Sequence, residues 1–288
     1  MHPTLYRLAC SALVITTLAA STARADVINS IPSCYAANNI TPFGPDHDKM
    51  VYFLIDQTVL LDKNLQTMVL ENIQRTLQPG TRFTIAEFSA FSQGRYLNVV
   101  ETGVIEQPIP QDQLENVVVD SIGPFNTCMR DQMAYAQRTA ISNAQQVMND
   151  STSSLDQSDI LMALKTVSTA VKEDTATDKV LVLVSDGIEN SSITSFYSHD
   201  TVRLIDPSKE MDKVTANQMV SDFGGAKVYV VGGAMMPAAK NGTQSTKDGY
   251  RSPNVLQGLS DFWSKYFTTS NANLIEFGEP ALVDPVSY

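Results

Sequence analysis

The chain has 288 residues, 43% of them hydrophobic, and its 31 acidic and 20 basic residues give a formal net charge of -11. This length is enough for one α/β domain with a buried core of its own. The excess of negative charge argues against nucleic acid and anionic membranes as partners, and it favours a cation or a basic protein surface.

Residues 1–25 have the composition of a secretory signal peptide. Arg7 gives a basic start, the run from Leu8 to Ala20 is apolar, and Ala23-Arg24-Ala25 is a small-x-small cleavage site. The apolar run is shorter than the roughly 20 residues that a membrane-spanning helix needs. We therefore expect cleavage before Asp26 and a periplasmic or secreted protein that is not inserted in the membrane.

Two cysteines remain after the signal peptide. Cys34 lies in a polar leader, residues 26–47, and Cys128 lies in a segment with helical spacing. An even pair of cysteines in an exported chain is typical of a disulfide, and two buried free thiols are the alternative. In the chain-entropy model, a bridge closing so long a loop stabilises the fold by ~4 kcal/mol.

The first elements of the domain follow the leader. Residues 50–56, MVYFLID, are a continuous apolar run, which is typical of a strand covered on both faces. Residues 62–78 place apolar side chains at helical spacing until Pro79-Gly80 ends the pattern. Residues 81–90 and 95–105 are rich in β-branched and aromatic residues and are separated by a polar turn, which predicts a hairpin.

Helical patterns and buried strands alternate through the rest of the chain. The last predicted helix carries Trp263, which we expect on its core face. The capping pair Ser158-Asp159 marks the start of an earlier helix. In chain order, the spacing predicts helices over 111–119, 128–148 and 158–173, strands over 179–187 and 226–236, a helix over 254–270 and a short strand over 271–277.

Strands that alternate with helices predict a doubly wound α/β domain over residues 48–288, with a mainly parallel sheet covered by helices on both faces. In such folds ligands bind beyond the carboxyl ends of the strands. Asp56 and Ser185-Asp186-Gly187 each follow a predicted buried strand. We therefore expect these polar side chains to meet at one rim of the sheet.

Three segments, LIDQT, SDILMAL and VLVLVSDG, resemble a von Willebrand factor A (VWA) domain in their order and spacing, from Asp48 to about Phe277. In that family a metal-ion-dependent adhesion site has Asp-x-Ser-x-Ser after the first strand, a threonine before a later helix, and an aspartate after the fourth strand. The resemblance places Asp56 and Thr58 on the first motif, Ser158 on the second and Asp186 on the third.

The chain departs from the family pattern at Leu60, which stands where a second hydroxyl is expected. Hydroxyl and carboxylate oxygens are hard ligands that suit Mg²⁺ or Mn²⁺. With one oxygen missing, the resemblance implies a degenerate site that binds either cation weakly and whose shell is completed by an acidic side chain of a partner protein. The alternative is a relic site whose polar groups cap neighbouring helices.

The sequence contains no complete catalytic set. An aspartate after a buried strand is similar to the nucleophile of haloacid-dehalogenase-like phosphatases, but those enzymes need a second aspartate where this chain has Thr58. His199 is isolated, and Asp46-His47-Asp48 indicates a solvated acidic turn. Gly232-Gly233 lacks the remaining glycines of a dinucleotide fingerprint.

These observations predict an exported, non-enzymatic VWA-like module that binds another protein with the help of a cation, in a cell-envelope, secretion or conjugation assembly. Two alternatives stay open. One is a metal-dependent hydrolase that uses the same rim, and the other is a metal-free structural subunit of an envelope complex. A hydrolase needs a base within reach of a bound water, and no residue stands out for that role.

Overall fold

The computed structural model describes residues 29–90, 97–152, 157–198, 201–235 and 252–288. The expected signal peptide, residues 1–25, lies outside the described residues, and so does His199. Within the described ranges, no helix is both long enough and apolar enough to cross a membrane.

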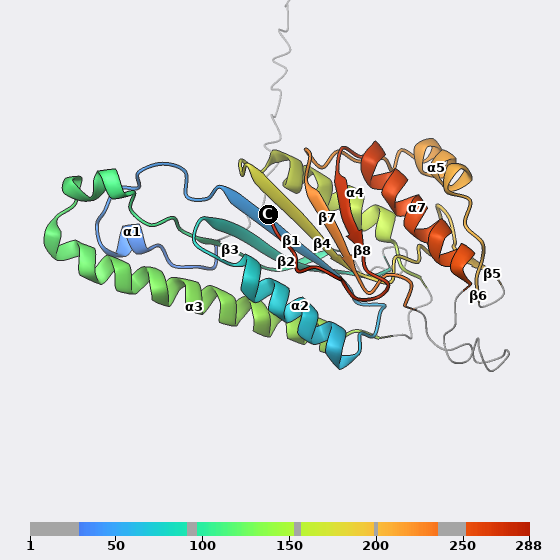
Figure 1. The fold of residues 1–288 in the computed structure, drawn as a ribbon, viewed down its shortest axis with the longest axis horizontal. Coiled ribbons are helices and arrows are strands. Elements are labelled where there is room, and N and C mark those ends of the chain that lie inside the picture. Colours follow the sequence, from blue (N-terminus) through green and yellow to red (C-terminus); the bar gives the residue numbers. More distant parts are fainter. Residues whose placement is uncertain (1–28, 91–96, 153–156, 199–200, 236–251) are drawn as a thin grey trace, which may run out of the picture.

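A six-stranded sheet forms the centre of the protein (Figure 1). Its strands, in spatial order, are β3 (Asn98–Ile105), β2 (Thr81–Phe88), β1 (Lys49–Asp56), β4 (Asp178–Val184), β7 (Lys227–Val231) and β8 (Asn273–Phe277). Only β3 is antiparallel to its neighbour. Counted along the chain, this is the 3-2-1-4-5-6 order of a doubly wound sheet, and the order reverses between β1 and β4. The predicted fold class is confirmed.

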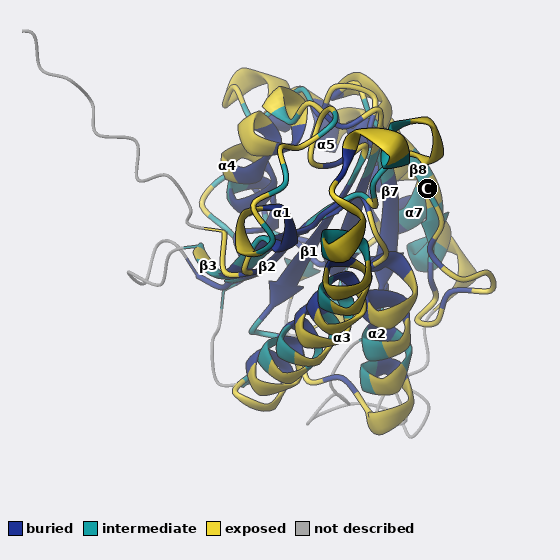
Figure 2. Ribbon diagram, turned by 90° about the vertical axis from the view of Figure 1, so that its left-hand side faces the viewer, coloured by how far each residue is buried: buried dark blue, intermediate teal, exposed yellow. Residues whose placement is uncertain are grey.

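Helices cover both faces of the sheet (Figure 1). Helices α2 (Lys63–Thr76) and α3 (Val119–Asn149) pack on one face, and α4 (Ile160–Glu173), α5 (Pro207–Ala216) and α7 (Pro253–Thr269) pack on the other. The strands between these two layers are buried, whereas the outer sides of the helices are exposed (Figure 2). A short antiparallel pair, β5 (Tyr197–Ser198) and β6 (Thr201–Val202), lies apart from the main sheet.

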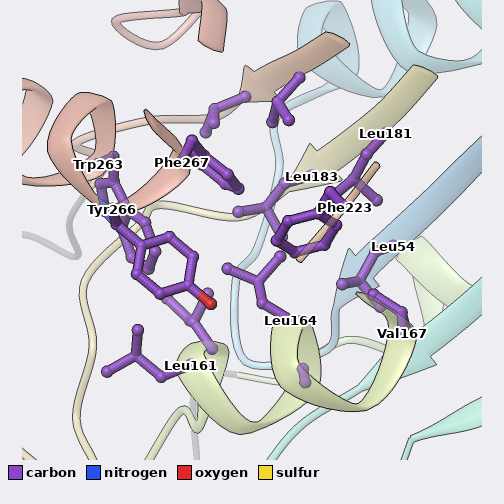
Figure 3. Close-up of a cluster of buried hydrophobic side chains, with 14 of the residues drawn as sticks. Leu54, Leu161, Leu164, Val167, Leu181, Leu183, Phe223, Trp263, Tyr266 and Phe267 are labelled. Carbon is purple, nitrogen blue, oxygen red and sulfur yellow. The ribbon is translucent and has the colours of Figure 1, made fainter. Parts of the chain in front are cut away.

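Strand β1 divides its side chains between two cores, because successive residues of a strand point to opposite faces. Val51, Phe53 and Ile55 belong to the core under α2 and α3. Leu54 belongs to the core under α4 and α7, where Figure 3 shows it with Leu164, Leu183 and the aromatic side chains of α7, including the fully buried Trp263. Because of this alternation, Asp56, which follows Leu54 by two positions, points to the same face of the sheet as Leu54.

Helix α3 differs from the prediction of two helical segments. Residues Gln111–Asn116 form a 3-10 helix, and a single α-helix of 31 residues then runs through Pro124. Proline inside a helix removes a hydrogen bond and so disfavours a continuous helix. Tertiary packing overrides this cost, because the adjacent Phe125 is fully buried and its ring centroid lies 4.8 Å from that of Tyr35.

The leader crosses the edge of β3 and is attached to α3 by the predicted disulfide. The backbone N–H of Ser30 donates to the carbonyl of Thr102 at 2.9 Å. Cys34, in the short helix α1 (Cys34–Ala37), is bonded to Cys128 of α3, with an S–S distance of 2.05 Å. The Glu106 carboxylate accepts hydrogen bonds from the Cys34 backbone N–H and from the hydroxyl next to it, which belongs to Ser33. The leader is therefore held at several points.

His47 lies in a buried cluster at the amino end of β1, so the expectation of a solvated turn is wrong for this residue. Its Nδ1 lies 2.6 Å from Asp46 Oδ1, and its Nε2 lies 3.1 Å from Asp174 Oδ1. The side chains of His47 and Asp174 are 3% and 4% exposed. Asp174, which follows α4, is far from His47 in sequence, so the pattern around His47 could not indicate it.

Candidate functional site

The candidate site lies at the carboxyl ends of β1 and β4, on either side of the point where the strand order reverses. Doubly wound folds bind ligands at this position. Ile55 is paired with Val184 in the sheet, so the next residues along the two strands, Asp56 and Ser185, lie side by side. Both follow residues of the α4 and α7 core by two positions and therefore point to that face of the sheet.

Four hydrogen bonds converge on the Asp56 carboxylate. Its Oδ1 accepts from the backbone N–H of Thr58 at 2.9 Å and from the Thr58 hydroxyl at 2.7 Å. Its Oδ2 accepts from the hydroxyl of Ser158 at 2.9 Å and from that of Ser185 at 2.8 Å. Three segments that are distant in sequence thus meet at one side chain.

Burial determines the electrostatics of this carboxylate. Asp56 is 1% exposed, and loss of hydration raises its pKa above the ordinary value, although the four donors partly oppose the shift. A carboxylate is stable inside a protein only when its oxygens are hydrogen-bonded, and here each oxygen accepts twice. Because the hydroxyls donate hydrogen bonds to Asp56, the lone pairs on their oxygens point away from Asp56.

The loop after β4 fixes Ser158. Ser158 and Asn190 exchange backbone hydrogen bonds of 3.2 and 3.0 Å. The adjacent Glu189 is fully buried, and its Oε2 accepts from the backbone N–H of Leu161 at 3.0 Å. Glu189 therefore caps α4, whereas the predicted capping residue Asp159 makes no capping hydrogen bond through its side chain. Burial raises the pKa of Glu189 to about 8.

Asp186 stands directly beyond Ser185, in a turn that neighbouring elements hold in place. Its Oδ1 accepts from the backbone N–H of Ile188 at 2.8 Å, and the residue is 8% exposed. Gly187 has a φ of +71°, and a Cβ atom there would lie 2.9 Å from the Trp263 indole nitrogen, which donates to the Gly187 carbonyl. Only glycine fits this position. The turn thus keeps Asp186 at the rim.

Leu60, at the position where the family pattern has a second hydroxyl, is 53% exposed. The nearby Asp62 acts as the N-cap of α2, because its Oδ1 accepts from the backbone N–H groups of Asn64 and Leu65 at 2.9 Å each. Asp62 is thus engaged with the helix. The first motif therefore offers one hydroxyl, that of Thr58.

The residues at the rim fit a hard cation in their chemistry. They supply hydroxyl oxygens from Thr58 and Ser158 and a carboxylate from Asp186, which are ligands of the kind that Mg²⁺ and Mn²⁺ prefer. The oxygens of Asp56 already accept four hydrogen bonds and orient the hydroxyls. Across the described ranges, no group of three or more His, Cys, Asp or Glu side chains is placed to hold a metal ion. A cation at the rim would thus depend on the hydroxyls.

Ser185 was expected at this rim, but the resemblance did not place it among the residues of the metal site. It is fully buried, and besides donating to Asp56 it accepts from the backbone N–H of Gly187 at 3.1 Å. A signal for it was present in the sequence, since it follows Leu183 by two positions and so points into the same core as Leu183.

No protein-family model and no curated protein sequence matches the chain. Solved structures that match include a von Willebrand factor type A protein from Catenulispora acidiphila, with 12% identity and a TM-score of 0.34 over 77% of this chain and 43% of the other. Proximal thread matrix protein 1 from the mussel byssus, with a zinc-occupied MIDAS motif, matches with 12% identity and a TM-score of 0.32 over 78% and 48% of the two chains.

The PilB minor pilin from Streptococcus sanguinis matches with 15% identity and a TM-score of 0.34 over 78% of this chain and 61% of the other. The matching structures thus include VWA domains, the family that the sequence resembles. The chain spans between 20% and 61% of the length of the first five such structures. Identities this low describe a likeness of fold alone.

Proposed function

We propose that the chain is a VWA-like module that binds another protein through the rim formed by Asp56, Thr58, Ser158 and Asp186. In this proposal the rim holds Mg²⁺ or Mn²⁺ weakly, and an acidic side chain of the partner completes the coordination shell. The observation that carries the proposal is the convergence of three hydroxyls on the buried Asp56 carboxylate, where the strand order reverses.

The chain's own residues have distinct tasks in this proposal. Asp56 accepts hydrogen bonds from the hydroxyls of Thr58 and Ser158 and so fixes the direction in which their oxygen lone pairs point. Asp186, held by the turn after β4, supplies negative charge at the rim. A bound cation would supply the positive charge that attracts a partner's carboxylate. Because the chain itself carries an excess of acidic residues, an acidic partner needs such a charge at the point of contact.

We propose a binding role rather than catalysis because the acidic groups near the rim already have structural tasks. Asp56 is 1% exposed and accepts four hydrogen bonds, and Asp186 accepts a hydrogen bond within its own turn. Glu189 is fully buried and caps α4. A general base must reach a bound water, and in this proposal Asp56 and Glu189 are directed into the protein while Asp186 is committed to the cation.

We also propose that the protein works outside the cytoplasm, in an envelope, secretion or conjugation assembly. The Cys34–Cys128 disulfide supports this location, because such bonds persist in oxidising compartments. The composition of residues 1–25 supports export in the same way. A partner of this module would therefore be another exported or surface protein.

Calorimetric titration of chelator-treated protein with Mg²⁺ and with Mn²⁺ tests the proposal. We expect weak binding by the wild type and a loss of about tenfold or more in affinity for Asp186→Asn, since one charged ligand becomes neutral. Asp178→Asn, at the exposed opposite end of the same strand, is the control and should bind as the wild type does. Absence of binding by the wild type would favour the metal-free structural subunit, and equal binding by Asp186→Asn would place the cation elsewhere.

A further inference from the structure

A groove of 690 Å³ lies beside the disulfide, on the side of α3 that faces the leader. We call it the α3 groove, and its lining includes Pro32, Pro124, Thr127, Cys128, Asp131 and Tyr135. Its volume is within the range of about 300 to 1,000 Å³ that small-molecule sites occupy. The groove is remote from the rim described above and plays no part in the proposed function.

The two sulfur-bearing residues of the disulfide differ in accessibility. Cys34 is 0% exposed and belongs to a small core with Tyr35, Phe125 and Met129. Cys128 is partly exposed and lines the α3 groove. Thiol–disulfide exchange requires an incoming thiolate to reach the sulfur that it attacks, so access decides which sulfur reacts. A thiol that enters the groove therefore reaches Cys128 and not the buried Cys34.

Charge selects the kind of thiol that approaches the bridge. The Glu106 carboxylate accepts from the Cys34 backbone N–H at 2.7 Å and from Nε2 of Gln132, another residue of the groove lining, at 3.1 Å. This carboxylate repels a thiol that carries a further negative charge. Asp131 contributes a second carboxylate, in the groove itself. A thiol that carries an additional negative charge should therefore react more slowly at Cys128 than a neutral or cationic thiol.

We propose that the α3 groove is a thiol-exchange site and that Cys128 is the sulfur attacked. In the reaction, a thiolate R–S⁻ attacks the Cys128 sulfur, a new R–S–S bond to Cys128 forms, and the Cys34–Cys128 bond breaks. The electron pair leaves on Cys34 as a thiolate, which takes a proton from water. The thiol that fits the groove is a small neutral or cationic one, because the lining combines proline and tyrosine side chains with the Asp131 carboxylate.

The leader stays in place when the bridge opens, since other contacts hold it. Ser30 remains bonded to Thr102, and Ser33 remains bonded to Glu106. The Cys34 thiol is therefore kept near Cys128. Once it has lost its proton again, its thiolate attacks the Cys128 sulfur of the mixed disulfide, R–S⁻ leaves, and the bridge is restored. Exchange at this site is thus reversible within the folded protein.

Mass spectrometry of the folded wild type tests which sulfur is attacked. The protein is treated with excess cysteamine, a cationic thiol, or with glutathione, an anionic one, and is quenched with N-ethylmaleimide. We expect the mixed disulfide on Cys128, the maleimide on Cys34, and faster reaction with cysteamine. An adduct found mainly on Cys34, or equally on both residues, would overturn the proposal.

A pair of single-thiol variants gives a second measurement. In native buffer, the free Cys128 thiol of Cys34→Ser should react with Ellman's reagent at least about tenfold faster than the free Cys34 thiol of Cys128→Ser. The rates of the two thiols measured in denaturant correct for their intrinsic reactivity. In denaturant the two rates should agree. If the buried Cys34 thiol reacts as fast as the Cys128 thiol in the native state, Cys128 is not the accessible partner.

Filling the groove tests its part in the reaction. Thr127→Trp places a large side chain in the lining, and Asn126→Trp places the same side chain at the preceding, exposed position of α3, outside the groove lining. We expect exchange by cysteamine to be several-fold slower in Thr127→Trp and unchanged in Asn126→Trp, at equal melting temperature. Equal rates in the two variants would show that the thiol does not enter through the groove.

Discussion

The hydroxyl of Ser185 donates a hydrogen bond of 2.8 Å to Oδ2 of Asp56, across the boundary between β4 and β1. This bond joins the two strands between which the sheet order reverses. It also supplies one of the four donors that make a buried carboxylate tolerable at this position. The rim is therefore built around a carboxylate that the protein's own hydroxyls hold in place.

Removal of the Ser185 hydroxyl should destabilise the fold. In Ser185→Ala, Asp56 Oδ2 keeps one donor, and we expect a loss of about 1.5 to 3 kcal/mol in the free energy of unfolding because the bond is made to a buried charged group. Ser142→Ala, an exposed serine on α3, is the matched control and should change little. Urea denaturation measures both, and equal stability of the two variants would contradict the role assigned to Ser185.

The disulfide should contribute measurably to stability. The double variant Cys34→Ser/Cys128→Ser leaves no free thiol after Asp26, and we expect it to unfold with roughly 2 to 5 kcal/mol less free energy than the wild type. Wild-type protein in excess reductant provides the control and should approach the same value. Melting curves that superimpose with and without the bridge would show that the leader contributes nothing through it.

The sequence was sufficient to predict most of the central sheet and several of its helices. The apolar run of residues 50–56 corresponds to β1, and the spacing over 158–173 corresponds to α4. Helix α5 was not predicted, although Asp206 and Pro207 form a good start signal, with the Asp206 side chain accepting from two backbone N–H groups. Its short length and mixed composition gave too little periodicity beyond that signal.

The stability of the protein should fall as Glu189 ionises. Burial raises the pKa of Glu189 from an ordinary 4.5 to about 8, so the folded protein retains a proton that the unfolded chain releases. This contribution is fully present below pH 4.5, falls as the pH rises from there, and is lost above the folded pKa of about 8. Glu189→Gln keeps an acceptor for the Leu161 N–H and cannot ionise.

The wild type should therefore lose stability relative to Glu189→Gln between pH 5 and pH 8.5. Thermal unfolding of both proteins across this range, in the presence of a chelator, measures the difference. A constant difference between the wild type and Glu189→Gln would mean that Glu189 has the same pKa in both states.

The candidate site was predicted less completely than the sheet, for a physical reason. Asp56, Thr58 and Ser158 follow strand ends or precede a helix, so their positions are visible in a one-dimensional pattern. The contact of Asp56 with its partner on β4 depends instead on which strands are neighbours and in what register. The contact of Asp56 with Ser185 requires the pairing of Ile55 with Val184, and that pairing appears only once the sheet is assembled.

Whether the rim holds a cation is tested most simply by the Mn²⁺ affinity of Leu60→Ser, measured from the electron paramagnetic resonance signal of free Mn²⁺. We expect a several-fold gain over the wild type, because the new hydroxyl restores the oxygen that the first motif lacks. Leu60→Ala, which removes the same apolar bulk and adds no oxygen, should match the wild type. No gain in Leu60→Ser, or an equal gain in Leu60→Ala, would contradict the claim that this rim holds a cation.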